Sequence, residues 1–219
     1  MSGLPTITTF RWVPEFARGY VRDLRARWAF EEEGQAYAVD LIDGPYAKSA
    51  AHRHFQPFGQ IPTYRDDEVE IFESGAIAIR IAEQGSHLLP TDTNGRLRAI
   101  QWVIAALNSV EPMVMQHAVV TLFEADCPWS PMRHDRVVAD IKSRLADLEA
   151  ALGDKPWLDG ETFTVGDLMM ISVLGGLRET DLLADFPKLT DFVARGEARP
   201  AHVKAMADHL AVYADAKAA

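Results

Sequence analysis

The 219-residue sequence predicts two domains, a small α/β domain with a mixed sheet followed by an all-α helical bundle domain. Two observations favour this division. Before about residue 85, short β-branched and aromatic segments alternate with helical ones, whereas the longer segments after residue 95 have the apolar spacing of helices. The stretch 85–95 between them is rich in turn-forming residues and predicts a linker. We therefore expect domains over residues 1–84 and 96–219, joined by 85–95.

The first domain is expected to begin with a strand, a helix and a second strand. Residues 6–12 are β-branched and aromatic, and residues 36–41 alternate in polarity, as strands do. Residues 17–33 between them carry apolar side chains at helical spacing, and Gly34 provides a stop. A strand–helix–strand order favours a parallel pair of strands.

The rest of this domain is expected to be a hairpin followed by a helix. The short apolar runs 61–64 and 69–72 flank the polar turn 65–68, and residues 74–82 complete the domain as a helix. Because the hairpin adds antiparallel strands to a parallel pair, the sheet should be mixed.

Three segments of the second domain are expected to be helices. Residues 96–107 and 137–152 each present one apolar face, whereas 164–177 is apolar nearly all round and should be buried. Thr164 and Asp167 have the spacing of a capping box at the start of that helix. We therefore expect Asp167 to have a structural role and not a catalytic one.

Composition excludes several classes of function. A net charge of −10 and the absence of a basic run disfavour nucleic acid or an anionic membrane as the main partner. No stretch is expected to supply the roughly 20 apolar residues that cross a bilayer, and the first residues have no secretory pattern. The single cysteine, Cys127, excludes an intramolecular disulfide and a CxxC redox pair, and it favours a cytoplasmic location. His52 and His54 have no further ligands at metal-binding spacing, so no metal site is expected.

Two short stretches of the first domain together suggest a site for a peptide-like ligand. The loop 56–62 reads QPFGQIP, and a cis bond before Pro62 would leave the Ile61 backbone as an unpaired edge that can bind a peptide. Ser74, at a helix start, offers a hydroxyl and backbone N–H groups to a carboxylate, and Glu73 can bind an ammonium. This pair suits the α-amino acid end of a γ-glutamyl group.

Each of these residues also has an ordinary structural role. Pro62 alone could be a turn proline, Ser74 a helix cap, and Glu73 a solvated acid that complements the helix dipole. Taken singly, the structural interpretations are favoured. Their combination at this spacing, followed by an apolar helix, favours binding.

The order of these stretches resembles the glutathione transferase family. The family pattern is a loop ending in Gly-x-Val/Ile-Pro, then a strand and Glu-Ser at a helix start. The buried capping segment 158–168 and the late segment 186–201, which ends in Arg-Pro-Ala, also match. The resemblance covers residues 6 to about 210.

The resemblance implies a thioredoxin-like first domain that binds glutathione, followed by the helical domain. It implies glutathione as co-substrate, a hydrophobic electrophile as second substrate, a homodimer and a role in detoxification. The residues that it places at the glutathione site are Gln60, Ile61, Pro62, Glu73 and Ser74.

The sequence departs from the family where the thiol should be activated. The family places a Tyr, Ser or Cys at the start of the first helix, and the segment 13–23 contains neither Ser nor Cys. Counting back from Gly34 leads to Tyr20, whereas counting forward from the first strand leads to 13–16. Tyr20 is the preferred donor to the thiolate, and a core position is the alternative for it. Arg18 could stabilise the thiolate by charge, or lie on a solvated face.

Three functions therefore stay open at this point. The first is transfer of the glutathione thiolate to an electrophilic, largely apolar molecule. The second is a glutathione-dependent isomerisation, dehalogenation or ether cleavage on the same fold. The third is a non-catalytic glutathione-binding or interaction module, against which the retained residues Gln60–Pro62 and the Glu73–Ser74 pair argue.

Overall fold

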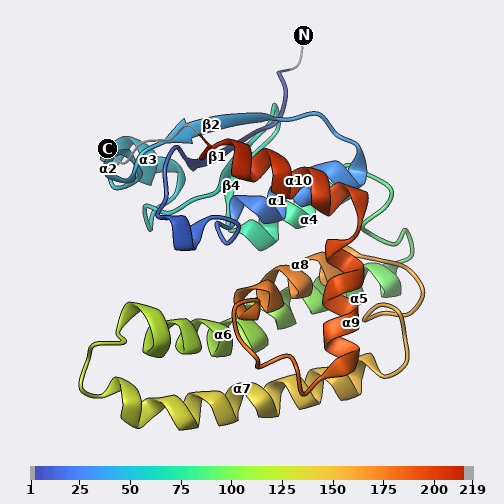
Figure 1. The fold of residues 1–219 in the computed structure, drawn as a ribbon. Helices are drawn as coiled ribbons and strands as arrows, with labels where there is room; N and C mark the ends of the chain where they lie inside the picture. The colour runs from blue at the N-terminus through green and yellow to red at the C-terminus, as the bar shows by residue number, and fades with distance from the viewer. Residues whose placement is uncertain (1–2, 215–219) are drawn as a thin grey trace. The chain divides into compact units, whose positions relative to one another are not determined.

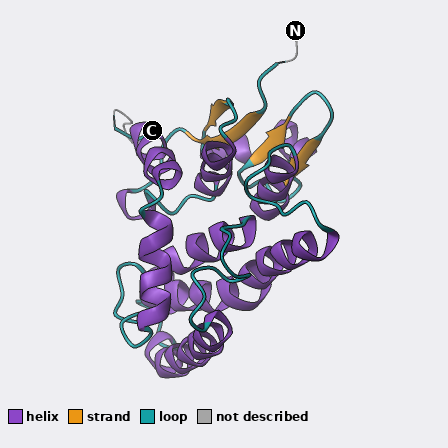
Figure 2. Cartoon of the chain, turned by 90° about the vertical axis from the view of Figure 1, so that its right-hand side faces the viewer, coloured by secondary structure: helices purple, strands orange, loops and turns teal. Residues whose placement is uncertain are grey.

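A computed structural model describes residues 3–214. The chain divides into two compact units. Residues up to Leu89, together with those from Arg199 onward, form the first unit, and Pro90–Ala198 form the second. Figure 2 shows that the strands all belong to the first unit.

The first unit contains a four-stranded sheet. Its strands are β1 (Thr6–Phe10), β2 (Ala38–Ile42), β3 (Thr63–Arg65) and β4 (Glu70–Phe72), arranged in the order β2-β1-β3-β4. β1 and β2 are parallel, whereas β1–β3 and β3–β4 are antiparallel. The mixed sheet predicted from the sequence is therefore confirmed.

The first helix begins later than the apolar spacing predicts. α1 spans Asp23–Glu33, not 17–33, because a short 3₁₀ turn, η1 (Glu15–Ala17), and Gly19 precede it. Gly19 has a φ of +82°, which a right-handed helix cannot contain. The helix ends as expected, at Gly34 in the left-handed conformation.

The last helix belongs to the first unit. α10 (Pro200–Ala211) lies beside α1 in Figure 1, on the opposite flank of α1 from α4 (Ser74–Glu83). Arg199 donates two hydrogen bonds of 2.6 Å to the Glu32 carboxylate, and the His202 ring packs edge-on against Trp28. The expected helical domain over 96–219 therefore loses its final helix to the sheet-containing unit.

The beginning of the expected linker is anchored to α1. The buried carboxylate of Glu33 accepts hydrogen bonds from the backbone N–H groups of Ser86, His87 and Leu88 at 2.7–3.2 Å. A Cβ on Gly85 would lie 1.9 Å from Glu33 Oε2, so only glycine fits there without rearrangement. Residues 85–89 thus pack as part of the first unit, and the unit boundary follows Leu89.

The second unit is helical. Its elements are α5 (Thr93–Ala105), the π-helical turn η2 (Ala106–Val110), α6 (Glu111–Ala118), the π-helical turn η3 (Val119–Phe123), α7 (Ser130–Leu152), α8 (Val165–Leu174), the 3₁₀ turn η4 (Gly175–Leu177) and α9 (Pro187–Glu197). α8 is the buried centre, and the predicted capping box is present at its start. The Asp167 carboxylate accepts from the Leu158 N–H at 2.7 Å and from the N–H and hydroxyl of Thr164 at 2.9 Å. Burial raises the pKa of Asp167 despite these bonds.

One helical segment in the described residues is longer and more apolar than its sequence predicts. Thr93–Phe123 covers 31 residues and is long and apolar enough to cross a membrane, by length and composition alone. Only 28% of its most apolar part is buried within the chain. Its exposed apolar side chains include Leu97, Ile104 and Leu122.

Candidate functional site

The loop before β3 is held by side chains from the preceding helical segment. This segment comprises α2 (Gly44–Ala47) and α3 (Ala50–Phe55). The Gln60 N–H donates to Gln56 Oε1 at 3.1 Å, and the Gln60 carbonyl accepts from His52 Nε2 at 2.7 Å. Lys48 Nζ donates to the Gly59 carbonyl at 2.7 Å. His52 and Gln56 are buried, so they fix the loop backbone and leave the Gln60 side chain exposed.

The loop ends in the proline predicted to have a special geometry. The Ile61–Pro62 bond is cis, and β3 starts at the next residue. Among the described residues 3–214, neither the N–H nor the C=O of Ile61 has a hydrogen-bond partner. This backbone segment can therefore pair with an extended peptide-like ligand.

Strand register places the two predicted binding stretches side by side. Thr63 pairs with Phe72 across the β3–β4 hairpin, so Pro62 and Glu73 are neighbours at the same end of the sheet. β1 runs antiparallel to β3, and the Thr63 N–H donates to Thr8 Oγ1 at 2.8 Å. The segment that leaves β1 therefore starts from this same end.

The start of α4 has an unusual backbone. Glu73 has φ 71° and ψ 117°, the one positive φ outside glycine among residues 3–214. Such a conformation costs on the order of 1–3 kcal/mol and is found most often at ligand-binding sites. It directs the chain so that Ser74, which is 4% exposed, becomes the first residue of α4.

An arginine that sequence reasoning did not select lies against Ser74. Arg25 is 6% exposed, and its Nη1 donates to Ser74 Oγ at 3.1 Å. A carboxylate bound at Ser74 would thus meet a hydroxyl, the N–H groups and dipole of α4, and a guanidinium charge. The signal in the sequence was a charged residue on the buried face of α1, between Leu24 and Trp28.

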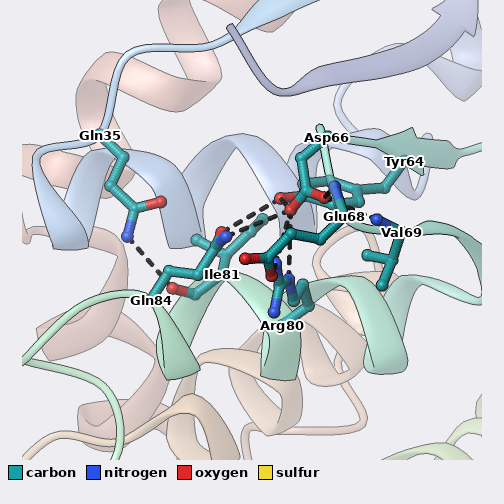
Figure 3. A network of polar contacts seen from close by, with 8 residues as sticks. All are labelled: Gln35, Tyr64, Asp66, Glu68, Val69, Arg80, Ile81 and Gln84. Atoms are coloured by element: carbon teal, nitrogen blue, oxygen red, sulfur yellow. Dashed lines mark hydrogen bonds and ion pairs between the residues drawn. The ribbon is translucent and has the colours of Figure 1, made fainter. Parts of the chain in front are cut away.

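A polar network fixes α4 against the hairpin (Figure 3). Arg80 Nη2 donates to Asp66 Oδ2 at 2.9 Å and to Glu68 Oε2 at 2.6 Å, and the Tyr64 hydroxyl donates to Asp66 at 2.7 Å. Gln84 Nε2 also donates to Asp66 at 3.2 Å. Because Arg80 and Gln84 lie on α4, these bonds set the position of the helix that carries Ser74.

The charge on Asp66 is strongly favoured in this network. Burial opposes its ionisation, but hydrogen bonds from Tyr64, Arg80 and the N–H groups of Glu68 and Val69 hold the pKa of Asp66 well below its usual value. Burial and the adjacent Asp66 carboxylate raise the pKa of Tyr64 well above that of a free phenol.

The candidate thiol-activating residues lie in a turn before α1. Tyr20 is 38% exposed, which contradicts a core position for its side chain. Arg18 is half-buried, and its Nε is buried without a hydrogen-bond partner in the described residues. Gly19 between them donates its N–H to His209 Nε2 on α10 at 3.2 Å.

The predicted site residues include no cysteine and no metal-binding cluster in the described part of the chain. Within residues 3–214 no group of three or more His, Cys, Asp or Glu side chains could hold a metal ion. Cys127 is half-buried in the second unit. A cavity of about 410 Å³ in the first unit lies between the strands and α2–α3, where Thr8, Arg11, Tyr46 and Phe55 line it. Neither Glu73 nor Ser74 lines that cavity.

A thioredoxin-like sheet unit with a cis-proline loop, combined with a helical unit, defines a class of protein. Family models for the N-terminal and C-terminal domains of glutathione S-transferase match residues 16–83 and 131–195. The chain is 30% identical over 194 residues to glutathione S-transferase F11 of Arabidopsis thaliana, covering 83% of this chain and 88% of that protein. The chain belongs to the glutathione transferase family.

Two further relatives have names that describe different activities. The chain is 27% identical over 177 residues to the disulfide-bond oxidoreductase YfcG of Escherichia coli, covering 77% of this chain and 80% of that one. A glutathione transferase of Burkholderia graminis, solved with two glutathione molecules bound per subunit, superposes with a TM-score of 0.78 at 25% identity. That match covers 93% of this chain and 87% of the solved one.

Proposed function

We propose that this chain is a glutathione transferase that binds glutathione at the open end of its β3–β4 hairpin, opposite the turn. The thiolate sulfur forms a C–S bond with an electrophilic, largely apolar molecule, and the leaving group departs with its bonding electrons. The observation that carries the proposal is the register of Thr63 with Phe72, which brings Ile61–Pro62 beside Glu73–Ser74. The glutathione bound to the Burkholderia graminis relative supports the choice of ligand.

Each part of glutathione has a matching group in this site. The γ-glutamyl carboxylate binds to Ser74 and the start of α4, with the charge of Arg25 behind the hydroxyl. The γ-glutamyl ammonium binds to Glu73. The cysteinyl backbone pairs with Ile61 beside Pro62, and the Gln60 side chain serves the glycyl end.

The thiol end of the bound peptide is assigned to the turn before α1. Tyr20 donates its hydroxyl to the sulfur, and Arg18 is the alternative that stabilises the thiolate by charge. Lowering the thiol pKa toward 7 raises the fraction of nucleophile at neutral pH. The absence of Ser and Cys from residues 13–23 supports a phenol or a guanidinium in this role.

A second candidate reaction is thiol–disulfide exchange. The similarity to the Escherichia coli disulfide-bond oxidoreductase favours it. One glutathione thiolate would attack a disulfide, and a second would resolve the mixed disulfide, giving a dithiol and glutathione disulfide. This reaction needs a bound thiolate but no leaving-group chemistry on carbon.

We also propose that the protein is a cytoplasmic homodimer. Exposed apolar side chains along Thr93–Phe123, together with the exposed Trp129 and Met132, support burial of this surface by a second copy. Sedimentation at micromolar concentration tests this directly: a monomer there would contradict the homodimer.

Calorimetry and two activity assays test the proposed reaction. Titration of the wild-type protein with glutathione should show binding that Ser74→Ala weakens, and no binding would refute the site. Turnover of 1-chloro-2,4-dinitrobenzene, read from conjugate absorbance, supports transfer. Reduction of a small disulfide without conjugate formation would instead support the oxidoreductase alternative.

A further inference from the structure

A buried polar cluster joins the start of α1 to the last helix of the chain. The Asp23 carboxylate is fully buried and accepts from Arg27 Nε at 2.8 Å. His209, also fully buried, places Nδ1 at 3.3 Å from the same oxygen of Asp23. The Tyr213 ring packs edge-on against the imidazole at 5.2 Å.

The hydrogen bonds of His209 define which ring nitrogen accepts a hydrogen bond and which one donates. A backbone N–H is always a donor, so His209 Nε2 must accept from Gly19 and carries no proton there. The ring proton of the neutral imidazole then lies on Nδ1, facing the Asp23 carboxylate. His209 therefore connects a fixed carboxylate in α1 to the backbone of the turn that precedes it.

A second side chain of α10 lies close to the turn. A Cβ on Gly19 would lie 3.6 Å from Met206 Sδ, one helical turn before His209. Gly19 lies directly between Arg18 and Tyr20. The position of both side chains thus depends on α10.

The cluster also has two buried polar atoms without hydrogen-bond partners among residues 3–214. They are Arg18 Nε and Asp23 Oδ1. Burial, and after it the Asp23 charge, raises the pKa of Tyr213 to about 12. A buried polar group that lacks a partner is costly.

We propose that His209 is a positioning residue of the thiol-activating turn. Its Nε2 holds the Gly19 N–H, and thereby sets Tyr20 and Arg18 for the glutathione sulfur. The second half of this proposal rests on the proposed function, whereas the hold on Gly19 does not. On this basis α10 helps to position the thiol-activating turn.

Two substitutions separate the two bonds of the imidazole. In His209→Gln, the amide oxygen takes the place of Nε2 and can still accept from Gly19. In His209→Asn, the amide nitrogen takes the place of Nδ1 and can still reach Asp23, but the Gly19 acceptor is lost. A purely structural role would be served about equally by either variant.

Amide hydrogen exchange in the ligand-free protein tests the hold on Gly19. Exchange over residues 19–20 should rise about tenfold in His209→Asn, the effect of losing one hydrogen bond, and stay near wild type in His209→Gln. Met206→Ala should raise the exchange rate of these amides by a smaller factor. It is the test variant to use if His209→Asn does not fold. Lys204→Ala, which removes a surface ion pair of α10 with Glu31, is the control and should leave it unchanged. Equal exchange in His209→Gln and His209→Asn, or no response to Met206→Ala, would overturn the proposal.

Kinetics then test the consequence for the sulfur. His209→Asn should raise the thiol pKa of bound glutathione and lower kcat, with KM for glutathione nearly unchanged. In His209→Gln both the thiol pKa and kcat should stay near their wild-type values. If His209→Asn instead raises KM and leaves the thiol pKa alone, the positioning role is refuted. If the wild type binds no glutathione in calorimetry, the proposed function fails while the exchange result still decides the hold on Gly19.

Discussion

The two ends of the candidate site are built in different ways. The carboxylate end, at Glu73 and Ser74, combines the β3–β4 hairpin and the helix that follows it with Arg25, which lies 49 residues before Ser74. The thiol end, at Arg18–Tyr20, is fixed by a bond to His209, 190 residues further along the chain. On the proposed assignment, binding the γ-glutamyl group depends on contacts within the first 83 residues, whereas placing the sulfur also requires α10.

The largest expected effect is a loss of glutathione affinity when Arg25 is removed from the carboxylate end. Arg25→Met should weaken glutathione binding roughly 10- to 100-fold, because a charge-assisted partner of the Ser74 hydroxyl is removed. Calorimetric titration measures it. Arg11→Met removes the same charge from an arginine that has no ion pair in the described residues, and should leave affinity nearly unchanged. Equal losses in both variants would show a general charge effect and not a site at Ser74.

The second prediction concerns the network that holds α4. Asp66→Asn should lower the free energy of unfolding by about 2 kcal/mol, since hydrogen bonds to a buried charge are weakened. Chemical denaturation measures this. Glu68 is the other carboxylate partner of Arg80, and its side chain is 73% exposed. Glu68→Gln should therefore change the free energy of unfolding by well under 1 kcal/mol. A similar loss in both variants would mean that surface charge, and not the buried network, supports α4.

The same network gives a pH dependence with a defined sign. The folded-state pKa of Asp66 lies below its unfolded value, which is about 3.9. Its contribution to stability is therefore complete above that unfolded value and is lost as the pH falls toward the folded one. Unfolding curves of Asp66→Asn should accordingly lose part of the wild-type acid destabilisation below about pH 4.

Sequence patterns predicted the structural features that depend on residues close together in the chain. The mixed sheet, the cis bond before Pro62 and the capping box at Thr164 and Asp167 are confirmed, because each follows from local composition and spacing. The start of α1 was wrong by six residues, since apolar spacing continued through a turn that the positive φ of Gly19 excludes from the helix.

Long-range contacts could not be predicted in the same way. Apolar spacing shows which face of α10 is buried but not what covers it, and the Glu32–Arg199 pair joins residues 167 positions apart. Arg25 was missed for a related reason. A charged residue within an apolar face has no visible partner until the fold brings Ser74 to it.

The third prediction addresses the donor at the thiol end. Tyr20→Phe should raise the pKa of bound glutathione by about one unit and leave its affinity nearly unchanged, because a hydrogen bond to the thiolate is lost while the Ser74 end is intact. Thiolate absorbance against pH measures it. Tyr46→Phe removes the hydroxyl of another exposed tyrosine in the first unit and should have no effect. If Tyr20→Phe changes nothing while Arg18→Gln raises the thiol pKa, the guanidinium is the activating group.

The smallest expected effect separates the geometry of the turn from its general stability. Gly19→Ala should cost about 1 kcal/mol, because a φ of +82° is unfavourable for any residue with a Cβ. Gly34→Ala carries the same kind of penalty at φ +63°, with open space around the new Cβ, and is the matched control. Both should lower the thermal midpoint similarly, but only Gly19→Ala should raise the thiol pKa of bound glutathione, because only Gly19 joins the turn to His209. An equal thiol pKa in the two variants would mean that the turn tolerates displacement, and the thiol end would then be no more dependent on distant contacts than the carboxylate end.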